Sequence, residues 1–166
     1  MSSDKVKIII GGSKGDSLIS SVIKWFQFGK EITHTFYCVP DTDLQDPEVI
    51  EAWHLPLKTL GGVRQGRFYR DDITKRYFYV EVTKEQAEKF HKFMLDRVGK
   101  HRYDYVGVLG FAIRSKDMQR DDSYFCSELI FEAFLHIGIT LLNYTKPQRV
   151  SPALLIRSPL LKEFSI

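Results

Sequence analysis

The chain has 166 residues, of which 43% are hydrophobic and 13% aromatic, and its formal net charge is +3. This length and composition exclude a disordered chain and predict a single packed domain over residues 1–166. The mild positive charge permits anionic partners but gives no clear indication of nucleic-acid binding. The two cysteines, Cys38 and Cys126, are expected to be free thiols in a reducing compartment.

Apolar runs in the chain are short. None reaches the roughly 18 residues that a membrane span requires, so no membrane span is expected. The first apolar run, residues 5–10, is too short for the core of a signal peptide and predicts a strand. We therefore expect a cytoplasmic protein, with association with a virion or with lysis as the alternative setting.

The order of the predicted elements indicates the fold class. Strands come mostly before helices, which predicts an α+β domain with an antiparallel sheet rather than a βαβ repeat. The glycine-rich stretch at residues 11–16 predicts a loop, and its spacing does not match a phosphate-binding loop. The predicted strands are 5–10, 31–39, 48–54, 63–69 and 75–82, and the predicted helices are 17–28, 84–98 after the cap Thr83, 124–137 and a short one from Pro152.

The last two predicted strands are expected to form a hairpin that carries both basic and aromatic side chains. Such a surface is typical of nucleic-acid binding, but an ordinary amphipathic hairpin with a solvated face has the same pattern and is the favoured interpretation. The basic residues are Arg64, Arg67, Arg70, Lys75 and Arg76, and the aromatic residues are Phe68, Tyr69, Tyr77, Phe78 and Tyr79.

A buried helix around Cys126 is the centre of the predicted fold. Asp121, Asp122 and Ser123 are residues that cap helix starts, apolar positions then recur on more than one face, and Gly138 is the predicted stop. Cys126 falls in the first turn, where free backbone N–H groups and the helix dipole stabilise a thiolate. Cys126 is therefore a candidate nucleophile.

A nucleophilic thiol needs a base, and the chain has five histidines. His136 follows Cys126 on the same helix at an axial distance of about 15 Å, which is too far for proton transfer. His34 lies within a predicted strand that would aim its ring rigidly, although a half-buried strand histidine is the commoner meaning. The remaining histidines lack a supporting pattern: His54, His91 and His101.

A third polar group would orient the base. Glu51 lies among apolar residues on the next predicted strand, where an unpaired carboxylate would be costly. Strand alternation places Glu51 and His54 on opposite faces, so only one of them can serve, and composition does not choose between them.

Five segments in this order resemble the permuted papain-like amidases (YiiX-like), which are relatives of the NlpC-like cysteine peptidases. The resemblance spans roughly residues 12–155, and its most specific part is the Cys-Ser-Glu-Leu sequence that begins at Cys126. It implies a circularly permuted papain-like fold, in which an antiparallel sheet packs on a central helix that bears the cysteine. The segments are 15–16 with 25–26, 32–36, 49–52, 103–107 and 125–129.

The resemblance also implies roles for individual residues. Cys126 would be the nucleophile, His34 the base and Glu51 the group that orients the base. Tyr105, in preference to Tyr103, resembles the tyrosine that these enzymes place near the nucleophile. The chain departs from the family pattern at Thr33, where serine is common and which keeps a hydroxyl group. No cofactor is implied, and the histidines and cysteines lack the spacing of metal ligands.

Three function classes are consistent with these observations. The first is a cysteine hydrolase that cleaves an amide or peptide bond through a thioester acyl-enzyme. The second is a lipid-directed thiol hydrolase or acyltransferase, because the scaffold is similar to the lecithin:retinol acyltransferase group. In that case Trp25, Phe26, Phe28 and residues 109–113 could line a groove for an acyl lipid. The third is a non-catalytic binding module that uses the predicted hairpin. The oligomeric state is left open.

Overall fold

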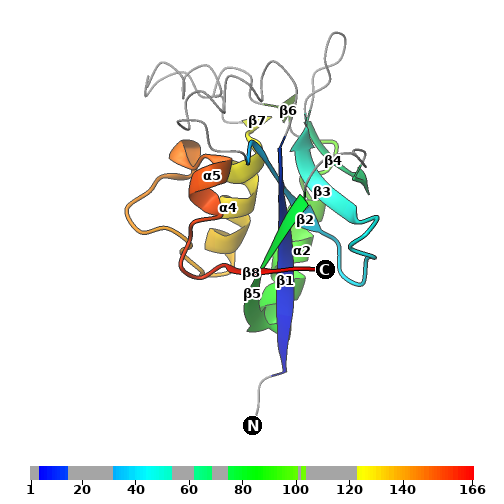
Figure 1. Ribbon diagram of the computed structural model, residues 1–166. Helices are drawn as coiled ribbons and strands as arrows, with labels where there is room; N and C mark the ends of the chain where they lie inside the picture. The colour runs from blue at the N-terminus through cyan, green and yellow to red at the C-terminus, as the bar shows by residue number, and fades with distance from the viewer. Residues whose placement is uncertain (1–3, 15–31, 54–61, 69–74, 101, 104–122) are drawn as a thin grey trace.

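Strands of one sheet form the framework of the domain (Figure 1). The structure is a computed structural model, and it describes residues 4–14, 32–53, 62–68, 75–100, 102–103 and 123–166. Within these ranges the strands are β1 Lys5–Ser13, β2 His34–Cys38, β3 Glu48–Trp53, β4 Gly62–Arg67, β5 Lys75–Thr83, β6 Arg102–Tyr103, β7 Ser123–Tyr124 and β8 Lys162–Phe164. They follow one another in the order β7-β6-β4-β3-β2-β1-β5-β8. Neighbours are antiparallel except for β6 and β7, which are parallel.

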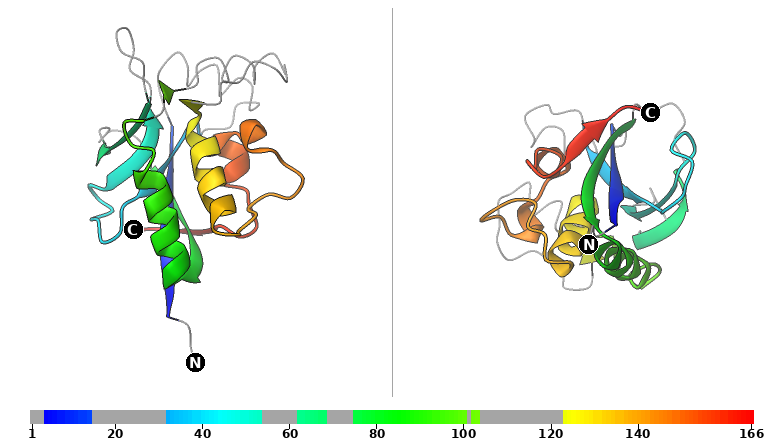
Figure 2. Two further views of the ribbon diagram at one scale, coloured as in Figure 1. Left: turned by 180° about the vertical axis from the view of Figure 1, so that it is seen from behind. Right: turned by 90° about the horizontal axis from the view of Figure 1, so that it is seen from below.

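Helices cover one face of this sheet. α2 (Lys84–Leu95) and α4 (Cys126–His136) lie side by side, as the view from behind in Figure 2 shows. α4 also contacts β2, β3, the 3-10 helix η1 (Pro147–Arg149) and the short helix α5 (Pro152–Leu155). The predicted α+β class with an antiparallel sheet is thus confirmed in its coarse form.

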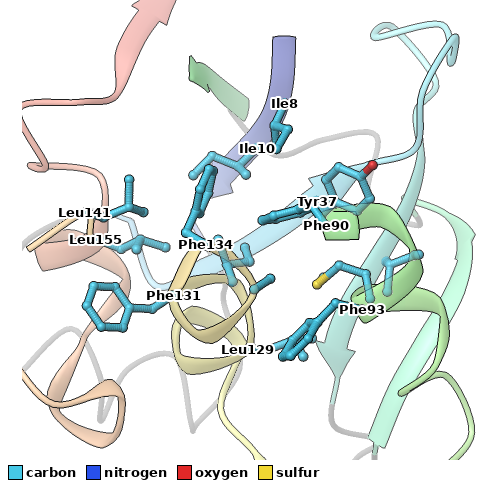
Figure 3. Close-up of a cluster of buried hydrophobic side chains, with 14 of the residues drawn as sticks. Ile8, Ile10, Tyr37, Phe90, Phe93, Leu129, Phe131, Phe134, Leu141 and Leu155 are labelled. Carbon is cyan, nitrogen blue, oxygen red and sulfur yellow. The ribbon is translucent and has the colours of Figure 1, made fainter. Parts of the chain in front are cut away.

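The main hydrophobic core lies between the sheet and these two helices (Figure 3). Strand alternation turns Ile8, Ile10 and Ile50 toward the helices, where they meet Phe90 of α2 and Phe134 of α4. α4 is buried along most of its length because the sheet, α2, η1 and α5 surround it. The prediction of a deeply buried helix with Cys126 in its first turn is confirmed.

β1 extends three residues beyond the predicted strand, so residues 11–13 are strand rather than loop. Gly11 faces Phe36 across the β1–β2 pair, and a Cβ atom built on Gly11 would lie 2.1 Å from the Phe36 ring. Glycine is needed here because the aromatic ring of the neighbouring strand lies directly on the backbone. The glycine at position 11, which contributed to the prediction of a loop, is therefore explained by close packing between two strands.

The predicted hairpin of residues 63–69 and 75–82 does not form. β4 pairs with β3 and β6, whereas β5 pairs with β1 along nine residues and with β8. The reason is burial: Phe78, Val80 and Val82 alternate on one face of β5 and join the core beside β1, whereas β4 contributes only Val63 to that core. The two stretches lie on strands that β3, β2 and β1 separate, and the binding module stays a prediction.

The helix ends that depend on a capping residue or on a glycine lie close to the predicted positions. Thr83 caps α2 and forms a capping box with Gln86, as the cap prediction required, although α2 ends at Leu95 rather than residue 98. Gly138 follows α4 with a φ of +78°, and Ser151 caps α5 at the predicted place. The predicted helix at residues 17–28 and most of the segment 101–114 lie outside the described residues.

The start of α4 differs from the prediction. Ser123 lies in β7, and the N-cap is Phe125, whose side chain cannot accept a hydrogen bond from the first turn. Instead Glu128 reaches back and accepts from the backbone N–H of Phe125 at 3.3 Å. This is one half of a capping box, so a carboxylate in the first turn replaces the expected cap. Asp121 and Asp122 lie outside the described residues.

Candidate active site

Three neighbouring elements bring the predicted site residues together. Cys126 is the first residue of α4, His34 is the first residue of β2, and Glu51 lies in β3. β2 and β3 are antiparallel neighbours, and α4 contacts both of them. The side chains therefore come from the end of a helix and from two strands that the core holds rigidly.

His34 is the middle member of the group. Its Nε2 atom is hydrogen-bonded to Glu51 Oε2, and the Cys126 side chain lies near enough to the ring to raise the pKa of His34. Because Glu51 engages Nε2, Nδ1 is the ring nitrogen that is left for a second partner. The His34 side chain is 17% exposed, and Cys126 is buried. The ring thus links a buried thiol to a buried carboxylate.

Glu51 is held from its other side by Arg64. The Arg64 Nε donates to Glu51 Oε1 at 2.8 Å, and a second guanidinium nitrogen donates to the same oxygen. The two residues are direct partners in the β3–β4 register. The Arg64 guanidinium also lies 4.3 Å from the centroid of the Trp53 ring. With a side chain 2% exposed, Glu51 is a buried carboxylate whose two oxygens both have partners.

The charges in this group reinforce one another. Burial lowers the pKa of His34, but the Glu51 carboxylate and the hydrogen bond with Cys126 outweigh it and raise that pKa to about 10. Burial acts to raise the pKa of Glu51, but His34 and Arg64 hold it below its ordinary value. Each of the two residues therefore favours the charged form of the other.

The residues that follow Cys126 have structural roles that explain the Cys-Ser-Glu-Leu sequence. Ser127 is buried and donates a hydrogen bond to the backbone carbonyl of Val150, next to α5. Glu128 caps the helix, and Leu129 is fully buried in the core. Together these contacts fix the first turn of α4, and with it the direction of the backbone N–H groups beside Cys126.

The second cysteine has a different environment. Cys38 lies in a separate apolar cluster with Phe36, Val49, Phe68 and Tyr77. Burial raises the pKa of the Cys38 thiol to about 12, with a small opposing effect of Lys75. A thiol in such surroundings is inert, so only the cysteine at the start of α4 has a partner for proton transfer.

Other histidines that were considered as bases have other contacts. His91 in α2 is hydrogen-bonded through Nδ1 to the Tyr37 hydroxyl at 3.2 Å. His136 ends α4, and its ring centroid lies 4.9 Å from that of Phe93. Tyr103 lies in β6. The remaining candidates lie outside the described residues: His54, His101, Tyr105, and the predicted acyl-groove residues 25, 26, 28 and 109–113.

Arg64 is the residue of this group that the sequence did not reveal. Its position in a basic and aromatic stretch indicated a solvated or nucleic-acid-binding face. Two other basic residues of that stretch also have acidic partners, since Arg67 pairs with Asp46 and Arg76 pairs with Glu163, whereas Lys75 donates to the backbone carbonyl of Gln45 at 3.3 Å. One feature of the sequence indicated that such a residue is needed: Glu51 is an acid among apolar neighbours, and a buried carboxylate requires a cation.

The chain was compared with protein-family models and with curated proteins. No protein-family model matches the chain, and no curated protein matches it. In the described part of the chain, no helix is long and apolar enough to cross a membrane. Over the same residues, no group of three or more histidine, cysteine or acidic side chains is placed to hold a metal ion.

Proposed function

We propose that the protein is a cysteine hydrolase that cleaves an amide or peptide bond through a thioester acyl-enzyme. One observation carries the proposal: the series Cys126, His34 and Glu51, in which an imidazole lies between a thiol at a helix N-terminus and a carboxylate. A thiol, a base and a group that orients the base are the parts that nucleophilic acyl transfer requires.

The first half of the reaction follows from this arrangement. His34 takes the proton of Cys126, and the sulfur attacks the carbonyl carbon of the substrate. Backbone N–H groups in the first turn of α4 stabilise the oxyanion that develops, and each such donor supplies about 2.7–4 kcal/mol. The carbon–nitrogen bond then breaks as His34 gives its proton to the departing amine, which leaves a thioester on Cys126.

Hydrolysis of the thioester completes the cycle. Neutral His34 takes a proton from water, and the hydroxide oxygen bonds to the thioester carbon. The carbon–sulfur bond breaks, the acid product leaves, and Cys126 and His34 return to their starting state. Glu51 holds the ring orientation throughout and stabilises the imidazolium form.

The order of the site residues along the chain bears on the type of α+β fold. We assign the domain to the circularly permuted papain-like fold, in which the histidine strand precedes the cysteine helix. The chain order supports this assignment, since β2 with His34 and β3 with Glu51 both come before α4 with Cys126.

The test compares wild type with Cys126→Ala on peptide, amide and acyl-thioester substrates. We expect hydrolysis to fall by several orders of magnitude, because removal of the nucleophile leaves only oxyanion and binding contributions. Intact mass spectrometry should show an acyl adduct on the wild type and none on Cys126→Ala.

Cys38→Ala is the matched control, because it also removes a buried thiol but leaves the site intact. It should keep the wild-type rate and the adduct. Equal turnover by Cys126→Ala and wild type would contradict the nucleophile assignment. An adduct formed from acyl thioesters but never from peptides would instead favour the lipid-directed class.

A further inference from the structure

Arg64 is the outermost member of the series that ends at Cys126, and nothing in the mechanism above assigns it a task. It reaches Glu51 from the strand opposite β2, so Glu51 lies between two cations: His34 on Oε2 and Arg64 on Oε1. The Arg64 side chain is 27% exposed, whereas Glu51 is almost completely buried. The guanidinium therefore lies at the outer boundary of a buried charge group.

The two cations differ in one respect that matters for a catalytic cycle. His34 alternates between its charged and neutral forms as it gives up and regains a proton, whereas an arginine stays protonated throughout. Each time His34 becomes neutral, Glu51 loses one of its two positive partners. A buried carboxylate with no cation would then take up a proton or turn away from the ring. Arg64 is the partner that keeps Glu51 charged during that interval.

Geometry fixes Arg64 for this task. The β3–β4 register sets Arg64 directly across from Glu51, and the guanidinium delivers two N–H groups to one carboxylate oxygen. Trp53 lies two residues beyond Glu51 on the same strand face, and its ring supports the guanidinium at 4.3 Å. Both the direction and the plane of the guanidinium are thereby restricted.

We propose that Arg64 is a positioning residue of the hydrolase, which holds Glu51 ionised and aligned on His34 while His34 is neutral. The inference rests on the proposed function and extends the site from three residues to four, with Trp53 as the support. Arg64 acts through Glu51, to which it donates two hydrogen bonds.

The test separates the charge of Arg64 from its forked shape. Arg64→Gln removes both, and Arg64→Lys keeps the charge alone. Arg67→Gln is the control, because Arg67 lies on the same strand and is paired with Asp46 on an exposed surface. Thermal unfolding of each variant establishes that it is folded before the other measurements are compared.

Hydrolysis as a function of pH is the first measurement. Arg64→Gln should lower the rate by roughly ten- to a hundredfold, the range for partners that orient a functional ligand. The acid limb of its pH profile should move up by about one pH unit, because Glu51 then takes up a proton more readily. Arg64→Lys should keep the acid limb of the wild type at a reduced rate, and Arg67→Gln should match the wild type.

The second measurement does not depend on turnover. The proton that His34 shares with Glu51 should give a downfield imidazole N–H signal in the NMR spectrum of the free protein, identified by its loss in His34→Gln. As the pH is lowered, Arg64→Gln should lose this signal at a higher pH than wild type does, because Glu51 takes up a proton more readily. Arg67→Gln should lose it at the same pH as wild type.

The two proposals can fail separately. A wild type without hydrolysis but with an Arg64-dependent His34 signal would overturn the proposed function, although Arg64 would still be shown to hold Glu51 on His34. A folded Arg64→Gln variant with wild-type hydrolysis and a wild-type signal at every pH would overturn the role of Arg64 and leave the hydrolase standing.

Discussion

At the scale of single residues, the pair of His34 and Glu51 couples the candidate site to the stability of the fold. The folded state holds the proton of His34 up to a pKa of about 10, whereas the ordinary value is 6.5. It also keeps Glu51 ionised below the ordinary carboxyl pKa of 4.5. A group that binds its proton differently in the folded and unfolded states makes the free energy of unfolding depend on pH.

The sign of this dependence differs for the two residues. The contribution of His34 to stability is fully present below about pH 6.5 and is lost as the pH rises toward 10. The contribution of Glu51 is present above about pH 4.5 and is lost as the pH falls through the lowered pKa. The pair therefore stabilises the fold most between these two ordinary pKa values.

His34→Gln tests the alkaline side of this window. The free energy of unfolding in urea should be higher for wild type than for His34→Gln near pH 6.5, and the difference should shrink as the pH approaches 10. Groups that titrate in both proteins cancel in the difference. His136→Gln is the control, since that histidine lies at the exposed end of α4. A difference that stays constant from pH 6.5 to 10 would contradict the raised pKa of His34.

At the scale of elements, the site depends on how closely β1 and β2 pack. Phe36, two residues after His34, lies over the backbone of Gly11 and against Phe68, with ring centroids 4.3 Å apart. The ring of His34 stacks toward Phe36 at a centroid distance of 6.3 Å. The contact between Gly11 and Phe36 thus sets the surface on which the histidine lies.

Gly11→Ala should lower the free energy of unfolding by about 1–3 kcal/mol, because its Cβ would overlap the Phe36 ring. Gly66→Ala is a matched control in β4, since its Cβ would meet only an Arg64 nitrogen at 3.9 Å. That variant should stay within about 0.5 kcal/mol of wild type. Equal losses in the two variants would show that general strand propensity, rather than the ring contact, explains the glycine at position 11.

At the scale of the whole molecule, residues from the end of the chain complete the sheet. β8 pairs with β5, and Phe164 packs near the rings of Tyr77 and Tyr79. Arg76 and Glu163 join the same two strands by an ion pair. In Figure 1 this last segment crosses the sheet beside the labelled C-terminus. β8 therefore covers backbone groups of β5 that would otherwise form an open edge.

Removal of residues 162–166 should uncover that edge. We expect a loss of about 0.5–3 kcal/mol in the free energy of unfolding and increased self-association, because an unpaired strand is a template for another chain. Sedimentation at rising protein concentration measures the association. Removal of residues 165–166 alone leaves β8 paired and should change neither quantity. If the variant that lacks residues 162–166 sediments like wild type, β8 has no protective role.

The amino-acid sequence by itself determined the features that depend on neighbours within one turn or one strand. The capping box at Thr83, the turn after α4 at Gly138 and the place of Cys126 at the start of a buried helix all follow from side chains a few residues apart. Local chemistry also misled where it was ambiguous, since the glycines from residue 11 predicted a loop, whereas Gly11 accommodates an aromatic ring within a strand.

Only the tertiary structure decided which strands are neighbours. His34 and Glu51 are 17 residues apart, and Glu51 and Arg64 are 13 apart, so both contacts depend on sheet order and register. The predicted hairpin failed for the same reason, because burial of β5 beside β1 outweighs the short connection to β4. The cation that a buried carboxylate requires could be anticipated from the sequence, but its identity as Arg64 is a property of the assembled sheet.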